Sequence, residues 1–254
     1  MKAKEIADVI GRFAPLSTQE AWDNSGFCIG SPEQEIHGVM IGLDCTPALI
    51  REAADKGADM VVTHHPLIFS GVKRIDPSTF QGEAIAEALR RGMVIYSAHT
   101  NADKAMGGVT ALMARRLSLS GVEPIVESNL AQMGTLPEPL SGEEFIKLVK
   151  RAFSLDVVRS SDPAGITVSK VALCSGSGSE FIPDAIRAGA DAFVTGEISY
   201  HKFFCEKGFM VLDIGHYESE VEIGEAIFSL LRKNFPTFAL YLSNEKLNNP
   251  IHYF

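Results

Sequence analysis

The chain has 254 residues and a formal net charge of −9 at neutral pH. Hydrophobic residues make up 46% and charged residues 22%, so the chain can build apolar cores, and general disorder is excluded. The acidic balance argues against a broad nucleic-acid-binding surface, which needs clustered Lys and Arg. No apolar run approaches the roughly 18 residues of a membrane span, and the N-terminal residues do not form the apolar stretch of a signal peptide. We therefore expect a cytoplasmic protein.

The first half of the chain shows a strand, helix, strand rhythm. An apolar stretch at 39–44 precedes a helical pattern at 47–58, and a second apolar run follows at 59–63. A further strand is expected at 92–98, and then a helix at 107–117. Short, nearly continuous apolar strands joined by helices predict an α/β fold with a mostly parallel sheet covered on both faces.

The middle segment, residues 121–165, has a different composition. It carries four prolines and one helical pattern at 141–153 between loop-like stretches. We interpret it as a connection between two domains. The expected division is a first α/β domain over 1–125 and a second over 126–254, with the terminal segments free to pack across this boundary.

The second half of the chain repeats the first. Sliding the sequence by 132 positions aligns Val39–Thr63 with Val171–Thr195 without a gap. The elements expected in this half are an apolar stretch at 170–178 and then strands and helices at 181–190, 191–195, 208–214 and 217–235. The repeat predicts two pseudo-symmetric α/β domains with mostly parallel sheets.

Histidines follow the predicted strands in both halves. His64 and His65 come directly after the strand that ends at Thr63, and His99 follows the next strand. In the second half, His216 follows the strand at 208–214. Ligands of open α/β sheets bind outside the carboxyl ends of the strands, so these side chains are candidates for one common site.

The spacing of histidine and carboxylate residues repeats as well. A shift of 117 positions places His99 on His216 and Asp103 on Glu220, so each half contains His-x-x-x-carboxylate. If the chain is helical from the histidine onward, residues four apart share one face and can bind the same ion. Imidazole with carboxylate suits Zn, Mn, Fe, Co or Ni rather than Mg or Ca.

The number of potential ligands favours two metal ions. A catalytic zinc site with an open position uses about three protein ligands. The sequence offers more than this, and the candidate ligands are His64, His65, Asp103, His216 and Glu220. We therefore predict two divalent ions per chain, which would activate a water for a hydrolytic step.

Three further polar residues lie near the same strand ends. Under the 132-residue shift Glu197 falls on His65, and His201 lies six residues after Thr195. These two residues and His99 are candidates either for acid-base or ligand-orienting roles, or for structural polar groups.

Several motifs together resemble a known family. They are AWDNSGF near the start, VTHHPLIF, YSAHTNAD, TGEISYH and DIGHYESE. These motifs, spread over nearly the whole chain, resemble the GTP cyclohydrolase I type 2 family, also called the Nif-three-like dinuclear metal-centre hexamer family. The chain resembles its short form, because it has no room for a domain inserted between the halves.

The resemblance implies a fold, an assembly and a ligand set. Two similar α/β domains would flank a two-metal cleft, and six chains would form a toroidal homohexamer with the sites facing an internal cavity. The family's metal ligands fall on His64, His65, Asp103, His216 and Glu220. His99, Glu197 and His201 fall on polar positions that line the cavity.

The sequence supports two functions of different classes. The first is a dinuclear-metal-dependent hydrolase that acts on a C–N, amide or phosphate centre of a small molecule, with nucleotides among the candidates. His99, Glu197 or His201 would transfer the proton. The alternative is a non-enzymatic metal-binding adaptor or chaperone-type protein. Turnover separates the two, because only an enzyme should depend on a non-ligand such as His99.

Overall fold

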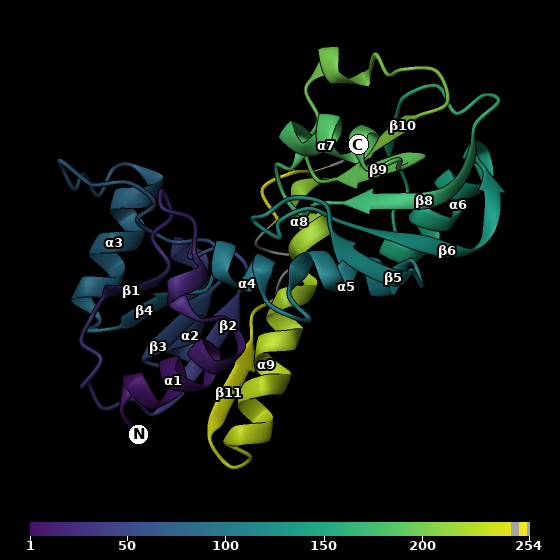
Figure 1. Ribbon diagram of the computed structural model, residues 1–254. Helices are drawn as coiled ribbons and strands as arrows, with labels where there is room; N and C mark the ends of the chain where they lie inside the picture. Colours follow the sequence, from purple (N-terminus) through teal and green to yellow (C-terminus); the bar gives the residue numbers. More distant parts are fainter. Residues whose placement is uncertain (245–248, 253–254) are drawn as a thin grey trace. The chain divides into compact units, whose positions relative to one another are not determined.

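The computed structural model describes residues 1–244 and 249–252, which form two compact units. Unit 1 contains Met1–Ala105 together with the described residues from Val221 onward, and unit 2 contains Met106–Glu220 (Figure 1). This division differs from the expected boundary at 125/126. The final helix and strand return to unit 1, and the residues just after 105 join the sheet and core of unit 2.

Unit 1 contains a five-stranded sheet with the strand order β1-β4-β3-β2-β11. Strands β2, β3, β4 and β11 are parallel, and β1 pairs antiparallel with β4. The strands of this unit are β1 (Gly26–Ile29), β2 (Gly38–Gly42), β3 (Met60–Thr63), β4 (Val94–Ser97) and β11 (Ala239–Leu242). Its helices are α1 (Ala3–Phe13), the 3-10 turn η1 (Leu16–Thr18), α2 (Pro47–Asp55), α3 (Phe80–Arg90), α4 (Thr100–Lys104) and α9 (Glu222–Asn234).

Helices cover both faces of this sheet. Met40 of β2 packs in one cluster with Leu49 and Ile50 of α2, whereas its neighbours Val39 and Ile41 are also fully buried but point the other way. On that second side α9 packs on β2 and β11, and α1 contacts α9. Burial on both faces explains why the central strands read as continuous apolar runs, as expected for a mostly parallel sheet.

Unit 2 contains a six-stranded sheet with the order β5-β6-β8-β9-β10-β7. Its strands are β5 (Ser120–Pro124), β6 (Gln132–Ser141), β7 (Arg159–Ser160), β8 (Thr167–Leu173), β9 (Ala192–Thr195) and β10 (Met210–Asp213). Its helices are α5 (Val109–Arg116), α6 (Gly142–Phe153), α7 (Ile182–Arg187) and α8 (His216–Glu220), with 3-10 turns η2 (Ser179–Phe181) and η3 (Tyr200–Phe203).

The unit 2 sheet is mixed, whereas the sequence predicted a mostly parallel one. Only the β8–β9 and β9–β10 pairs are parallel. The segment interpreted as a connection, residues 121–165, supplies most of β5 and all of β6 and β7, and these strands pair antiparallel. The sequence did not predict β6, because its prolines are typical of a loop. Pro137 and Pro139 are tolerated in this strand because they lie where its pairing with β8 is interrupted.

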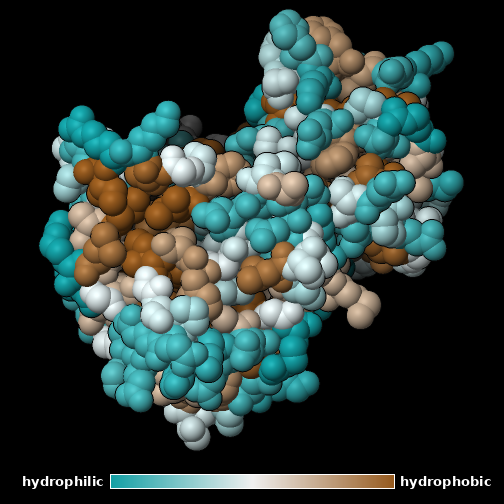
Figure 2. Space-filling view, turned by 60° about the vertical axis from the view of Figure 1, so that its left-hand side comes forward, coloured by the Kyte–Doolittle hydropathy of each residue, from teal (hydrophilic) through white to brown (hydrophobic). Residues whose placement is uncertain are grey.

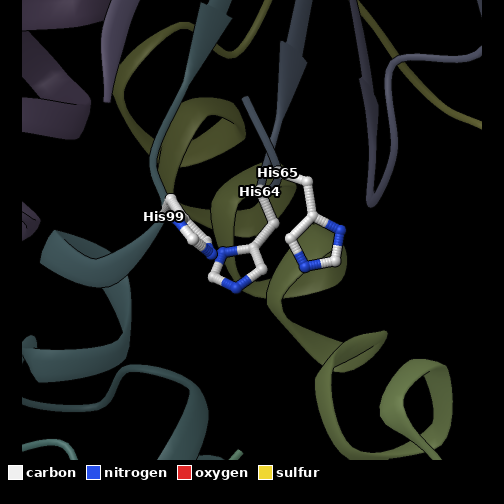
Figure 3. A group of neighbouring side chains, drawn as sticks. All are labelled: His64, His65 and His99. Carbon is white, nitrogen blue, oxygen red and sulfur yellow. The ribbon is translucent and has the colours of Figure 1, made fainter. Parts of the chain in front are cut away.

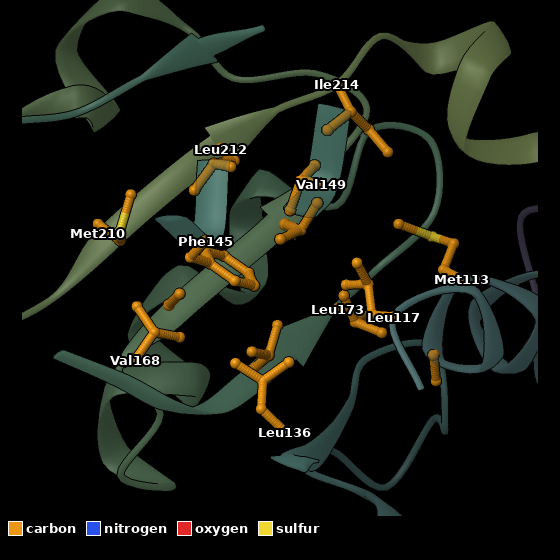
Figure 4. Close-up of a cluster of buried hydrophobic side chains, with 14 of the residues drawn as sticks. Met113, Leu117, Leu136, Phe145, Val149, Val168, Leu173, Met210, Leu212 and Ile214 are labelled. Carbon is orange, nitrogen blue, oxygen red and sulfur yellow. The ribbon is translucent and has the colours of Figure 1, made fainter. Parts of the chain in front are cut away.

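The core of unit 2 forms where α6 packs against its sheet. Ser141 caps α6 by accepting from the backbone of Glu144, whose carboxylate in turn accepts from the backbone of Ser141. Phe145 and Val149 of this helix are fully buried among side chains such as Val168 and Leu212 (Figure 4). This core supports the strands whose carboxyl ends carry Thr195 and Asp213.

The two units repeat one strand-helix-strand plan with the same register. In unit 1, Val39 pairs with Met60 and Ile41 with Val62. In unit 2, Val171 pairs with Ala192 and Leu173 with Val194. Each pair in the second unit lies 132 positions after its counterpart in the first, which is the shift that aligns the sequences. The repeat is therefore structural.

Among the helices that the structure describes, none is both long and apolar enough to cross a membrane.

Candidate metal centre

Three histidines of unit 1 come together at the ends of β3 and β4. His64 and His65 follow β3, where both backbone N–H groups donate to the carbonyl of Leu43 at 3.1 and 3.0 Å. The hydroxyl of Thr63 donates to the carbonyl of His65 at 2.8 Å and so closes the same turn. His99 follows β4 as the N-cap residue of α4. The short turns aim all three side chains to the same side of the strand ends (Figure 3).

The three imidazoles form a group that could hold a metal ion. Each offers one ring nitrogen, and these atoms of His64, His65 and His99 lie within 4.8 Å of one another. The ring centroids are 5.0 to 5.5 Å apart. For His99 the sequence left acid-base, ligand-orienting and structural roles open, and its ring is 5.2 Å from that of His64, compared with 5.0 Å for His65.

An oxygen atom orients each of these rings. The Nδ1 atom of His64 lies 2.8 Å from the carbonyl oxygen of Ala98, and the Nδ1 atom of His65 lies 2.8 Å from a carboxylate oxygen of Asp44. The Nδ1 atom of His99 lies 2.8 Å from a carboxylate oxygen of Asp23. Because these oxygens accept, each Nδ1 carries the proton, and in the neutral ring Nε2 has the lone pair that a metal ion needs.

Asp103 adds a carboxylate to this group. It lies one helical turn after His99, and its backbone N–H donates to the carbonyl of His99 at 3.0 Å. The buried carboxylate is 3.6 Å from Nε2 of His64. The helical turn that the shared-ion interpretation required after the histidine is present as α4, and it brings His99 and Asp103 to the same region of unit 1.

Asp23 is a buried anion beneath His99. Burial raises the pKa of this carboxyl, but the hydrogen bonds from His99 and Thr100 lower it by more, so its pKa lies far below the usual range. The Thr100 backbone and hydroxyl donate to it at 3.0 and 2.5 Å. An ionised Asp23 holds the imidazole of His99 in one orientation.

Unit 2 brings a second set of potential ligands together on α8. The Nε2 atom of His216 lies 3.1 Å from a carboxylate oxygen of Glu220, and its Nδ1 atom lies 3.1 Å from Glu197. Glu220 is almost fully buried, whereas the Glu197 side chain is about half exposed. Glu197 therefore occupies an orienting position beside His216 rather than the interior of the cluster.

His201 does not join either set. It lies on η3 with an exposed side chain and packs against the ring of Tyr200 at a centroid distance of 5.3 Å. Among the residues that the structure describes, His201 belongs to no group of three potential ligands within 4.8 Å of one another.

The glycine-rich turn after β8 serves the carboxylate of Glu220. Gly176 has a φ of +55°, and a Cβ added to it would collide with the Glu220 carboxylate and approach Nε2 of His216 to 3.2 Å. The backbone N–H groups of Gly176 and Gly178 donate to the hydroxyls of Ser219 and Thr195. The turn thus packs its backbone against the candidate ligands, and these two N–H groups bind protein hydroxyls rather than an anion.

Two orienting residues escaped the sequence analysis. Asp23 lies within the AWDNSGF motif and Asp44 at the end of the VMIGLD stretch. Both are carboxylates in conspicuous positions, but their histidine partners lie 76 and 21 residues away. Contact over these separations depends on the pairing of β1 with β4 and of β2 with β3.

This geometry defines the class of the protein: it is an α/β protein with potential metal ligands at matching strand ends. The family model described as Duf34/NIF3 (NGG1p interacting factor 3) matches residues 1–249. The chain therefore belongs to the Duf34/NIF3 family, as the motifs predicted.

Curated relatives and solved structures agree with this membership. A "GTP cyclohydrolase 1 type 2 homolog" of Clostridium perfringens is 29% identical over 261 residues and is covered completely, as is this chain. The crystal structure of Staphylococcus aureus hypothetical protein SA1388 has a TM-score of 0.90 at 26% identity, with 100% of this chain and 99% of that one covered. Reduced HcgD from Methanocaldococcus jannaschii has a TM-score of 0.83 at 26% identity, covering 96% and 98%.

The packing of Gly176 gives a test of the unit 2 cluster. We expect Gly176→Ala to lower the free energy of unfolding by more than Gly189→Ala, measured by urea denaturation. Both glycines have positive φ, so both substitutions carry a backbone cost of about 1 kcal/mol or more. Only at Gly176 does the added methyl meet Glu220, because nothing lies within 4 Å of a Cβ at Gly189. Equal losses would show that the turn can move away from Glu220 without cost.

Proposed function

We propose that the protein is a metal-dependent hydrolase of a small molecule and that His64, His65, Asp103, His216 and Glu220 hold two divalent ions. The observation that carries this proposal is the convergence of His64 and His65, with His99 beside them, each with its Nδ1 atom held by an oxygen acceptor. Histidines that bind metals are commonly fixed in this way. A buried carboxylate 3.6 Å from His64 completes a donor set that suits Zn, Mn, Fe, Co or Ni.

The use of ligands from both units in one dinuclear centre is part of this proposal. Unit 1 supplies His64, His65 and Asp103, and unit 2 supplies His216 and Glu220. The matching spacing of His-x-x-x-carboxylate in the two units supports a shared function. So does the motif resemblance, which places the family's ligands on the same residues.

The remaining polar residues can move and hold protons. Divalent ions at the site would supply Lewis acidity and lower the pKa of a bound water toward about 7. His99 is the first candidate for the general base, because its Nδ1 proton is held by the ionised Asp23 and its Nε2 can accept a proton. Glu197 would orient His216 through its contact with Nδ1. His201, on the exposed η3 turn, is an alternative proton carrier.

Metal analysis tests the ligand set. We expect reconstituted protein to bind about two divalent ions per chain and His65→Ala to bind at least one fewer, measured by elemental analysis after gel filtration. His37→Ala is the matched control, because His37 belongs to the same unit but pairs with Asp59 on the surface. Full metal content in His65→Ala, or none in the wild-type protein, would contradict the proposed centre.

Turnover tests the hydrolase. We expect the metal-loaded protein to hydrolyse a member of a panel of nucleoside triphosphates, phosphate esters and amides, followed by chromatography. His99→Gln should lower kcat by about 10²- to 10⁴-fold with unchanged metal content, because it removes proton transfer. If His201→Gln shows this loss of kcat and His99→Gln does not, His201 rather than His99 transfers the proton. Absence of turnover over the whole panel would favour the metal-binding adaptor.

We also propose that the chain assembles into a homohexamer, as the motif resemblance implies. Closed rings saturate identical interfaces, so the assembly should persist on dilution. Sedimentation velocity at decreasing concentrations should show one hexameric species. A monomer or dimer at all concentrations would refute the assembly without bearing on the ligand set.

A further inference from the structure

Asp213 is a buried carboxylate at the end of β10, and its hydrogen bonds reach two segments of the unit 2 cluster. Only 6% of its surface is exposed. Its Oδ1 atom accepts from the backbone N–H of Gly215 at 3.1 Å, and its Oδ2 atom accepts from that of Ile198 at 3.0 Å. Gly215 directly precedes His216 in the chain. Ile198 directly follows Glu197. One carboxylate therefore holds the neighbours of two residues whose side chains meet at 3.1 Å.

Arg159 completes the hydrogen bonding around Asp213. The two residues lie opposite each other in the antiparallel pair of β7 and β10. One guanidinium nitrogen of Arg159 donates to Asp213, and another donates to the carbonyl of Ile198, both at 2.9 Å. The same guanidinium lies over the ring of Phe203, 4.9 Å from its centroid. Arg159 thus contacts the segment after β9 at two points, next to Glu197 and at the end of η3.

The guanidinium stabilises the buried charge of Asp213. Burial raises the pKa of this carboxyl, and the two backbone N–H groups and the charge of Arg159 lower it only in part. Without the guanidinium, the carboxylate would be buried without a compensating cation, which favours its movement toward water and away from both N–H groups. Glu197, whose side chain is about half exposed, is placed by the backbone that these contacts fix.

We propose that Arg159 and Asp213 are positioning residues that hold Glu197 against His216 and thereby raise the affinity of the unit 2 ligands for a divalent ion. Glu197 contacts Nδ1 of His216, which leaves Nε2, the nitrogen near Glu220, for the ion. A carboxylate at Nδ1 fixes the imidazole and makes it a stronger ligand. This inference rests on the proposed function and adds to it two residues that act through Glu197.

Hydrogen exchange in the metal-free protein, followed by NMR, tests whether the contacts hold the two backbone segments. We expect Arg159→Met to speed exchange of the Ile198 and Gly215 amides by about fivefold or more, the change that corresponds to the loss of one hydrogen bond. Arg187→Met is the matched control and should leave both rates unchanged, because Arg187 is an exposed arginine of the same unit that pairs with Asp184. Unchanged exchange at both amides in Arg159→Met would overturn the proposal.

Zn²⁺ affinity, measured by competition with a chelating dye, tests whether Arg159 acts through Glu197. We expect Arg159→Met and Glu197→Ala each to weaken Zn²⁺ binding about tenfold to a hundredfold, as is usual when the partner of a ligating histidine is lost. In the double variant, the Arg159 substitution should add little, because the contact that it supports is already absent. Equal losses from Arg159→Met with and without Glu197 would assign Arg159 a merely structural role and overturn the proposal.

A second variant covers the case in which Arg159→Met does not fold. Asp213→Asn preserves the shape of the side chain but has one acceptor oxygen instead of two, so at least one of the two amides should exchange faster. Unchanged exchange at both would again overturn the proposal. Hydrophobic residues gather on the surface of unit 1 (Figure 2), and such patches favour association of destabilised variants. All variants are therefore compared at the elution volume of the wild-type protein in gel filtration.

The two proposals fail in different ways. Normal metal content and turnover in the wild-type protein, combined with equal Zn²⁺ losses from Arg159→Met in both backgrounds, would remove the positioning role and leave the hydrolase. Faster amide exchange in Arg159→Met and a Zn²⁺ loss that requires Glu197, in a protein without turnover, would leave the positioning residues and remove the hydrolase.

Discussion

The orientation of three imidazole rings by oxygen acceptors is the constraint on which the candidate centre depends. A carbonyl group holds His64, and carboxylates hold His65 and His99. Each contact fixes both the direction of the ring and the position of its proton. These contacts require that the ends of β2, β3 and β4 and the Asp23 loop meet at one edge of the unit 1 sheet. The fold of unit 1 thus determines the orientation of the three imidazole rings.

In unit 2, Glu197 contacts Nδ1 of His216, and close packing further confines the candidate ligands. Gly176 lets the turn after β8 approach Glu220 so closely that no side chain fits there. Gly196 lies close to the other candidate ligand, because a Cβ added to it would be 2.7 Å from the backbone of His216. Two glycines therefore confine the start and the end of α8, and with them both candidate ligands of this unit.

The sequence predicted the repeated framework because local patterns encode it. The apolar runs at 39–44 and 59–63 are strands buried on both faces, and the 132-residue shift reappears in the strand register. The His-x-x-x-carboxylate interpretation required a helical turn after His99, and α4 supplies it, whereas the helix predicted at 107–117 is α5. Strand β6 was missed because its prolines suggest a loop, and its place in the sheet depends on β8, which follows later in the chain. The partnerships of Asp23 with His99 and of Asp44 with His65 likewise arise only when distant strands pair.

The discontinuous composition of unit 1 has a consequence for biosynthesis. Unit 2 is one continuous segment, so its strands are all present once the chain has been made to Glu220. The sheet of unit 1 ends with β11, which pairs with β2 from about 200 residues earlier. On the ribosome, where domains fold as units while synthesis proceeds, unit 2 can complete its core first. The three histidines of unit 1 are synthesised early, but their sheet remains open at the β2 edge until the last strand emerges.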